Sequence, residues 1–261
     1  MTKDPPTIDK DSTILETLDI LNKKSIDSVC VCDNGKLIGY IGYREILSKI
    51  GTEKSRILSI GSLHNSGFLK KFPTTLSNDA SIRKCAELML DLKVPSLPVF
   101  YGETFLGIIF RSHMMYFVED SIIPINLILR KDIPVVYPHN RVIHARRLML
   151  DNHLLIIPVL NDDGKVIGAI SEREMVNSLI EFHKRISEKH QRAKIREFSI
   201  SNAMILKVPT IENETPLSDV IKILKKEQIP GVIVVENEKF IGILTHNEIL
   251  AYILQSFPEG V

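Results

Sequence analysis

The stretch "GKVIGAISEREM", residues 164–175, joins an apolar strand and the start of a helix through a very short junction. Apolar residues lie on both sides of Gly168, and Ser171 is followed three positions later by Glu174. A serine with a glutamate three residues on is typical of a helix N-terminus, where the hydroxyl and the carboxylate each accept a backbone amide. The stretch therefore predicts a strand, a tight junction and a capped helix.

The same arrangement recurs along the chain. Aligned on a glycine that follows two apolar residues, the copies are "GKLIGYIGYREIL" (35–47), "GETFLGIIFRSHMM" (102–115), "GKVIGAISEREM" (164–175) and "NEKFIGILTHNEIL" (237–250). Their anchor glycines are Gly39, Gly107, Gly168 and Gly242. The spacing between these glycines is similar but too uneven for a solenoid, so the chain is predicted to contain four copies of a larger unit.

The residues before each anchor glycine also follow one order. A copy opens with a short β segment such as "VPTIENETP" (208–216) and continues with a helical stretch such as "SIRKCAELMLDLK" (81–93). In that stretch the apolar residues recur at three- and four-residue spacing, which is typical of an amphipathic helix. A second strand such as "GVIVVE" (231–236) comes before the anchor strand and the closing helix. Each copy therefore predicts the order β-α-β-β-α.

This order resembles the cystathionine β-synthase (CBS) domain. The resemblance also rests on Pro98–Val99 and Pro158–Val159 in the second strands and on the closing turn of Gly, an apolar residue, Ser or Thr, and an acid. It covers four repeats, about 5–50, 68–118, 127–180 and 200–254. It implies an α/β (α+β) fold in which CBS repeats pair through their sheets.

Pairing of the repeats is expected from burial as well, because a single β-α-β-β-α unit leaves one apolar sheet face exposed. In the CBS family two paired repeats form a Bateman module. The resemblance implies two such modules, residues 1–120 and 121–261, in a disk-like assembly.

The closing turn carries groups that suit a nucleotide. A helix N-terminus with a hydroxyl beside it favours a phosphate, and a carboxylate one turn on can accept hydrogen bonds from the two ribose hydroxyls. In the CBS family these positions, Ser or Thr and then Asp, hold adenosine ligands. The matching residues are Ser171 with Glu174 in the third repeat and Thr245 with Glu248 in the fourth. The resemblance thus implies an adenosine site chiefly in the C-terminal module.

The first two repeats depart from this pattern. Gly42 of the first repeat lacks the hydroxyl, and Phe110 with His113 in the second lacks both groups. In the third and fourth repeats Glu replaces the family's Asp, and glutamate is the residue that a capping box prefers. Helix capping alone, worth about 1 kcal/mol per cap, is therefore the alternative interpretation of both pairs.

Further candidate residues surround the two turns. Arg173 and His246 lie next to the turn residues and can reach a phosphate. The resemblance implies that a slot for the base forms between the chain that leads into one repeat and the second strand of its partner. The candidates for this slot are Ile133, Val208, Ile156 and Val232.

Composition and motifs exclude several classes of function. With 33 basic and 32 acidic residues the net charge is +1, which supplies no global field for nucleic acid or an anionic membrane. The start "MTKDPPTIDKD" has no apolar core of a secretory signal, and no run reaches the roughly 18–20 apolar residues of a membrane span. The histidines lack metal-ligand spacing, and no nucleophile elbow or phosphate loop is present. A cytoplasmic, non-enzymatic protein without a metal, a required cofactor or a membrane partner is predicted.

These expectations combine into a regulatory sensor of an adenosine-containing ligand, namely AMP, ADP, ATP or S-adenosylmethionine. A homo-oligomer, expected to be a dimer, and a regulated protein partner of unknown identity belong to this prediction. A ligand-free structural or protein-interaction scaffold is the alternative. Nucleic-acid binding through residues 181–198, with six Lys or Arg against three Glu, is a further alternative, but a solvated helix explains that segment more simply.

Overall fold

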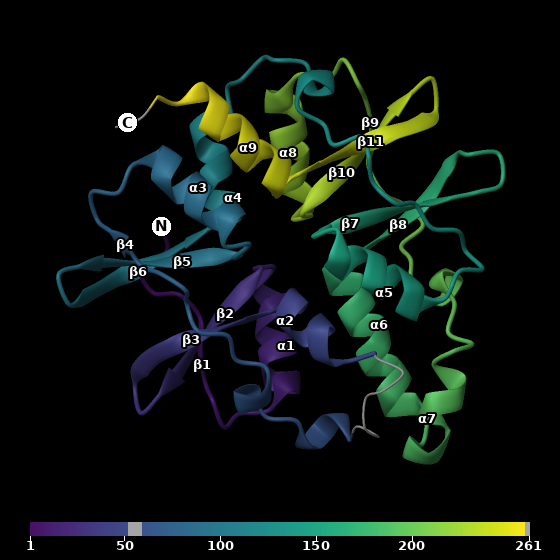
Figure 1. Cartoon of the computed structure of the whole chain (residues 1–261), viewed down its shortest axis with the longest axis horizontal. Helices are drawn as coiled ribbons and strands as arrows, with labels where there is room; N and C mark the ends of the chain where they lie inside the picture. The colour runs from purple at the N-terminus through teal and green to yellow at the C-terminus, as the bar shows by residue number, and fades with distance from the viewer. Residues whose placement is uncertain (52–58, 259–261) are drawn as a thin grey trace. The chain divides into compact units, whose positions relative to one another are not determined.

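The computed structural model describes residues 1–51 and 59–258. In chain order the first two repeats contain β1 (Thr7–Asp9), α1 (Ile14–Lys24), β2 (Ser28–Asp33), β3 (Lys36–Gly42) and α2 (Tyr43–Lys49), then β4 (Leu76–Ser77), α3 (Ile82–Asp91), β5 (Ser96–Tyr101), β6 (Thr104–Phe110) and α4 (Arg111–Met114) (Figure 1). Short 3₁₀ helices follow each of these repeats, at Ile60–Ser62, Asn65–Gly67, Met115–Val118 and Ile125–Leu127.

The last two repeats repeat the order. They contain α5 (Val142–Asp151), β7 (Ile156–Leu160), β8 (Val166–Ser171) and α6 (Glu172–Arg185), then β9 (Thr210–Glu212), α8 (Leu217–Glu227), β10 (Gly231–Glu236), β11 (Lys239–Thr245) and α9 (His246–Ser256). Between them lie α7 (Glu188–Lys194) and the 3₁₀ helix Ile200–Asn202. The predicted β-α-β-β-α order is confirmed, and the basic segment 181–198 contains the end of α6 and α7.

Each repeat builds its own small sheet. In the first, second and fourth repeats the second strand lies in the centre, parallel to the opening strand and antiparallel to the third strand. In the third repeat β7 and β8 form a two-stranded sheet, and the opening segment makes one parallel bridge from Val136 to Val159. Pro134 and Pro138 lie on either side of Val136 and have no amide to donate, which limits the ladder to that bridge.

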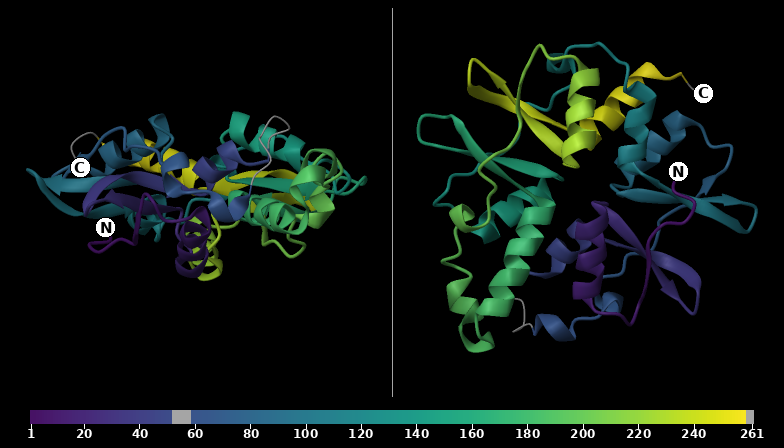
Figure 2. Two further views of the ribbon diagram at one scale, coloured as in Figure 1. Left: turned by 90° about the horizontal axis from the view of Figure 1, so that it is seen from below. Right: turned by 180° about the vertical axis from the view of Figure 1, so that it is seen from behind.

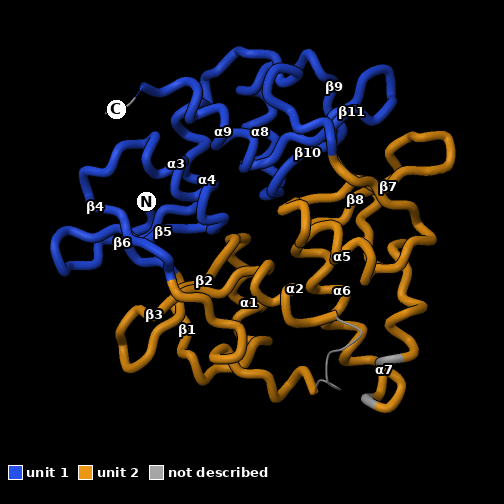
Figure 3. Tube along the Cα trace, in the orientation of Figure 1, with its two compact units in different colours: residues 1–5, 72–132, 209–261 blue, residues 6–71, 133–208 orange. Residues whose placement is uncertain are grey.

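The chain divides into two compact units (Figure 3). Unit 1 comprises Met1–Pro5, Phe72–Asp132 and Pro209–Val261, and unit 2 comprises Pro6–Lys71 and Ile133–Val208. Unit 1 thus holds most of the second and fourth repeats, and unit 2 most of the first and third. The predicted modules 1–120 and 121–261 group the repeats differently and stay a prediction.

Helix contacts and apolar side chains hold each unit together. In unit 1, α3 and α9 lie side by side (Figures 1 and 2), and in unit 2, α2 contacts α6. The residues buried in unit 1 include Met89, Leu97, Ile108, Met114 and Ile253, and those in unit 2 include Ile14, Ile41, Leu47, Met149 and Leu179. The helices therefore bury one apolar face each, as the three- and four-residue spacing predicts.

A second backbone pairing joins consecutive repeats along the chain, and both partners of each bridge lie in the same unit. The residues just before the opening strand of a repeat, here called the lead-in segment, pair with the third strand of another repeat. The bridges join Thr2 to Ile108, Lys70 to Tyr40, Arg130 to Ile243 and Ile205 to Ala169, each through two hydrogen bonds of 2.8–3.0 Å. Each lead-in segment thereby adds a single β-bridge at the edge of a sheet.

This pairing explains the repeated anchor glycine. Gly39, Gly107, Gly168 and Gly242 each come directly before the bridged residue of the third strand. A Cβ atom on any of them would lie closer than 3.0 Å to the carbonyl oxygen of the bridging lead-in residue. Only glycine allows this approach without displacing the lead-in backbone.

Gly168→Ala is expected to lower the free energy of unfolding by about 1 to 3 kcal/mol, because the new methyl group pushes against the carbonyl of Ile205. Gly61→Ala is the matched control, since no atom lies within 4 Å of a Cβ there, and its effect should stay within about 0.5 kcal/mol. Urea unfolding of the two variants makes the comparison. Equal losses at both glycines would contradict the close-approach explanation.

The closing helix of the second repeat begins in an unusual way. Nδ1 of His113 accepts the amide of Phe110 at 3.0 Å, and Nε2 lies 3.3 Å from the hydroxyl of Thr2 in the lead-in segment. Burial, with a smaller effect of the N-terminal ammonium, lowers the pKa of His113 to about 4. His113 is therefore neutral in the folded chain at neutral pH.

The stabilisation that depends on neutral His113 should be lost as the pH falls from about 6.5 to about 4. In this window the unfolded histidine takes up a proton and the folded one does not, so unfolding is favoured. His113→Gln should flatten the pH dependence of the unfolding free energy by up to about 1.4 kcal/mol per pH unit. Urea titrations of both proteins across this range measure the difference. Parallel profiles would show that His113 titrates alike in both states.

Candidate functional site

The closing turn of the third repeat places a hydroxyl against a carboxylate. Ser171 ends β8 and is the N-cap of α6, and its side chain is buried at 3% exposure. Its amide donates to Oε2 of Glu174 at 3.2 Å, and its hydroxyl donates to the same oxygen. The amide of Arg173 donates to Oγ of Ser171 at 3.2 Å. The pair thus forms a complete capping box at the start of α6.

The fourth repeat has the same geometry. The amide of Thr245 donates to Oε2 of Glu248 at 2.9 Å, the hydroxyl donates to that oxygen too, and the amide of Asn247 donates to Oγ1 of Thr245 at 3.2 Å. Burial raises the pKa of Glu248, although the hydrogen bonds from Thr245 and the nearby charge of Arg130 oppose the shift. This carboxyl therefore has a weaker preference for its charged form than an exposed glutamate.

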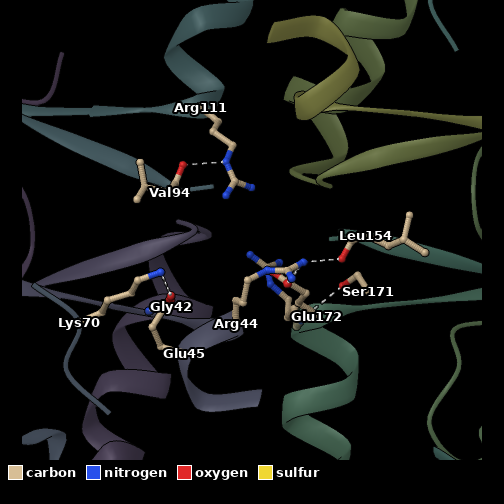
Figure 4. Close-up of polar contacts among 10 residues, drawn as sticks. Gly42, Arg44, Glu45, Lys70, Val94, Arg111, Leu154, Ser171 and Glu172 are labelled. Carbon is tan, nitrogen blue, oxygen red and sulfur yellow. Dashed lines mark hydrogen bonds and ion pairs between the residues drawn. The ribbon is translucent and has the colours of Figure 1, made fainter. Parts of the chain in front are cut away.

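The predicted caps are present at Ser171 and Thr245, and the first repeat shows that the cap does not need a hydroxyl. The amide of Gly42 donates to Oε2 of Glu45 at 3.1 Å, and Nζ of Lys70 lies 4.0 Å from the other carboxylate oxygen (Figure 4). All four repeats therefore use the residue three positions after the cap to satisfy the cap amide. The hydroxyls of Ser171 and Thr245 are additions to a cap that works without them.

The two candidate phosphate ligands lie in different surroundings. Arg173 donates from Nε to the phenol oxygen of Tyr43 at 3.2 Å, and its guanidinium lies 5.6 Å from the centre of that ring. It is thus held by α2 within unit 2. His246, the first residue of α9, is 5% exposed, and its amide donates to the carbonyl of Pro230 at 3.1 Å.

Of the four residues predicted to line a slot for the base, two lie on buried strands and two follow lead-in segments. Ile156 pairs with Ser171, Val232 pairs with Leu244, and both are buried. Ile133 and Val208 are half-buried, on the chain that follows two lead-in bridges. Unit 2 contains Ile133, Val208 and Ile156 as well as Ser171, Arg173 and Glu174, whereas unit 1 contains Val232, Thr245, His246 and Glu248.

Arg111 is a candidate that the motif comparison did not select. It is the first residue of α4, is 6% exposed and donates from Nε to the carbonyl of Val94 at 3.1 Å (Figure 4). Across residues 1–51 and 59–258, no carboxylate forms an ion pair with it. Because α4 contacts α9, this cation belongs to the same unit as Thr245. In the sequence Arg111 directly follows a capping residue, as His246 does, and this position is the signal that could have identified it.

A pair of opposite charges joins the start of α2 to the start of α6 in unit 2. Nη2 of Arg44 lies 2.6 Å from Oε1 of Glu172 and also donates to the carbonyl of Leu154 at 2.8 Å (Figure 4). The side chains of Arg44 and Glu172 are only 18% and 14% exposed. The first turn of α6 therefore holds a carboxylate that is already neutralised by the protein.

Metal-binding clusters and membrane-spanning helices are both absent from the described residues. In the part of the chain that the structure describes, no three His, Cys, Asp or Glu side chains are placed to hold a metal ion. Among the same residues, no helix has the length and apolar character needed to span a bilayer.

Comparisons with known proteins agree with the fold. A crystal structure of protein MJ1225 from Methanocaldococcus jannaschii, described as a candidate archaeal homologue of g-AMPK, superposes with a TM-score of 0.81 at 19% identity over 97% of both chains. Protein MJ1404 of the same organism is 22% identical over 264 residues, and this chain spans 60% of its length. An inosine-5'-monophosphate dehydrogenase of Korarchaeum cryptofilum is 27% identical over 108 residues, 41% of this chain and 22% of that enzyme.

A family model for the CBS domain matches four segments, residues 1–52, 66–120, 125–181 and 196–255. These segments coincide with the four repeats predicted from the anchor glycines, and they cover most of the sequence. The chain belongs to the CBS domain family and consists of four CBS domains in series.

Proposed function

We propose that the chain is a regulatory sensor that binds an adenosine-containing ligand at the closing turns of its third and fourth repeats. The observation that carries the proposal is the buried cation in unit 1. Arg111 has no carboxylate partner in the described part of the chain, and a buried charge is costly unless it meets an opposite charge. A phosphate group bound beside α4 and α9 would supply that charge.

The turn of the fourth repeat supplies the other contacts that such a ligand needs. Thr245 offers a hydroxyl at the start of α9, and Glu248 offers a carboxylate that can accept hydrogen bonds from ribose hydroxyls. His246 lies between them and Arg111 lies on the neighbouring helix, so both can face a phosphate. AMP, ADP and ATP all carry these groups.

Apolar surface next to the turns supports binding of the base. In unit 2 the lead-in segment pairs with Ala169, two residues before Ser171, and it leaves Ile205 and Leu206 36% and 69% exposed. In unit 1 Leu127 is 71% exposed just before the lead-in bridge at Arg130. A purine stacked on such side chains would cover apolar area that is otherwise in contact with water.

A ligand held in this way would couple two repeats. It would contact a lead-in segment, which belongs to one repeat, and a closing turn, which belongs to another. Ligand binding would then favour the conformations in which both are in place, and a protein partner could respond to that shift. The role is proposed as non-enzymatic and intracellular, with a homodimer as the expected assembly.

A ligand-free scaffold is the second candidate, and one observation favours it. At Gly42 and Phe110 the residue three positions later satisfies the cap amide, although neither cap residue has a hydroxyl. The boxes at Ser171 and Thr245 can therefore be explained by helix stability alone.

Replacement of the buried arginine tests the sensor directly. Arg111→Gln should weaken AMP binding at least tenfold and change adenosine binding little, because only AMP carries the phosphate. Calorimetric titration of the full chain measures both affinities. Arg147→Gln is the control, since it removes an exposed arginine outside the turns. The sensor proposal fails if the wild-type chain binds none of AMP, ADP, ATP and S-adenosylmethionine.

Thr245 is proposed both to cap α9 and to contact the ligand. These two roles can be separated by comparison with Ser81, which caps α3 and lies outside the proposed ligand turns. Thr245→Ala and Ser81→Ala each remove a capping hydroxyl and should each cost about 1 kcal/mol of stability, because Oγ of Ser81 accepts the amide of Lys84 at 3.1 Å. Only Thr245→Ala should also weaken AMP binding. Calorimetry and urea unfolding on the same samples give both quantities. Unchanged AMP affinity in Thr245→Ala would support the scaffold.

A further inference from the structure

We infer that Glu172 acts as an internal substitute for a ligand phosphate, so that the Ser171 turn takes an adenosine compound without a phosphate. This inference rests on the proposed function and specifies the ligand class at one of its two turns. Glu172 directly follows the capping residue Ser171, where a phosphate at the start of α6 would lie. Its carboxylate already occupies that end of the helix.

The partner of Glu172 is a cation that a phosphate would otherwise use. Arg44 holds the carboxylate at 2.6 Å and uses the same Nη2 atom to donate to the carbonyl of Leu154 at 2.8 Å. Both side chains are largely buried, so their attraction is screened less than that of a surface pair. A phosphate would have to displace Glu172 from Arg44 and would leave the carboxylate next to its own charge.

The second arginine at this end of unit 2 is engaged as well. Nε of Arg173 donates to the hydroxyl of Tyr43, and that hydroxyl donates to Oδ1 of Asn22 at 2.9 Å. The side chains of Asn22 and Asn177 are hydrogen-bonded to each other in turn. Arg173 is therefore anchored between α2 and α1 and is not free to turn toward a ligand anion.

The residues at the equivalent positions of unit 1 include a buried arginine in place of an acid. The residue after the cap is Arg111 in the second repeat and His246 in the fourth, whereas in unit 2 it is Tyr43 in the first and Glu172 in the third. One unit thus presents a buried arginine and a histidine, and the other a neutral phenol and a paired acid. The same closing turn therefore selects an anionic 5′ group in unit 1 and an uncharged or cationic 5′ group in unit 2.

The test compares adenosine with AMP in a full-length chain whose unit 1 turn is disabled by Arg111→Gln and Thr245→Ala. In this background adenosine should bind at least tenfold more tightly than AMP. Addition of Glu172→Gln should improve AMP affinity at least tenfold and change adenosine affinity less than threefold. Glu181→Gln is the matched control, since it removes an exposed carboxylate of the same helix that pairs with Lys184.

The outcomes separate this inference from the proposed function. AMP binding as tight as adenosine binding in the background chain, or no gain with Glu172→Gln, overturns the role of Glu172 and leaves the sensor intact. The inference is also overturned if the wild type binds adenosine or AMP and the background chain binds neither, because the Ser171 turn then takes no ligand. The adenosine and AMP affinities are compared in the background chain, which retains Glu172. This comparison therefore tests the inference even if the Glu172→Gln variant fails to fold.

Discussion

The backbone pairing between a lead-in segment and the strand after an anchor glycine is the constraint on which the rest of this structure depends. It joins one repeat to the third strand of another through two hydrogen bonds, and it tolerates only glycine at the adjoining position. Because the third strand ends two or three residues later, the pairing also determines where each closing helix begins. The turn residues that the sensor would use are positioned by this contact.

Capping and ligand binding compete for the same atoms in the third and fourth repeats. The carboxylates of Glu174 and Glu248 accept the amide and the hydroxyl of their caps, so a ribose would share them with the helix start. The cap alone therefore cannot identify a ligand turn, since every repeat has one. The residue just after the cap differs between the repeats, and under the proposed function it would separate a turn suited to phosphate from one whose acid is already paired.

Much of the fold could be predicted from the sequence because its signals are local. The anchor glycines, the alternation of strand and helix, and the hydroxyl–carboxylate spacing at Ser171 and Thr245 each lie within a few residues, and the predicted elements and caps are confirmed. The opening strand of the third repeat was overestimated because Pro134 and Pro138 restrict its ladder.

The site was less predictable because its contacts join residues far apart in the chain. Arg173 was expected to face a phosphate, but Tyr43, 130 positions away, holds its guanidinium. Arg111 becomes a candidate site residue only because α4 contacts α9, and Glu172 only because it forms an ion pair with Arg44. No periodicity within one repeat reports such pairings.

Hydrogen exchange with and without AMP tests the central claim most directly, since that claim is that ligand binding joins a lead-in segment to a closing turn. In unit 1, AMP should slow exchange of the amides around Arg130 and at the start of α9 together, while α1 and α5 stay unchanged. Slowed exchange elsewhere with no change at these two segments would contradict it, as would no change at any segment under saturating AMP.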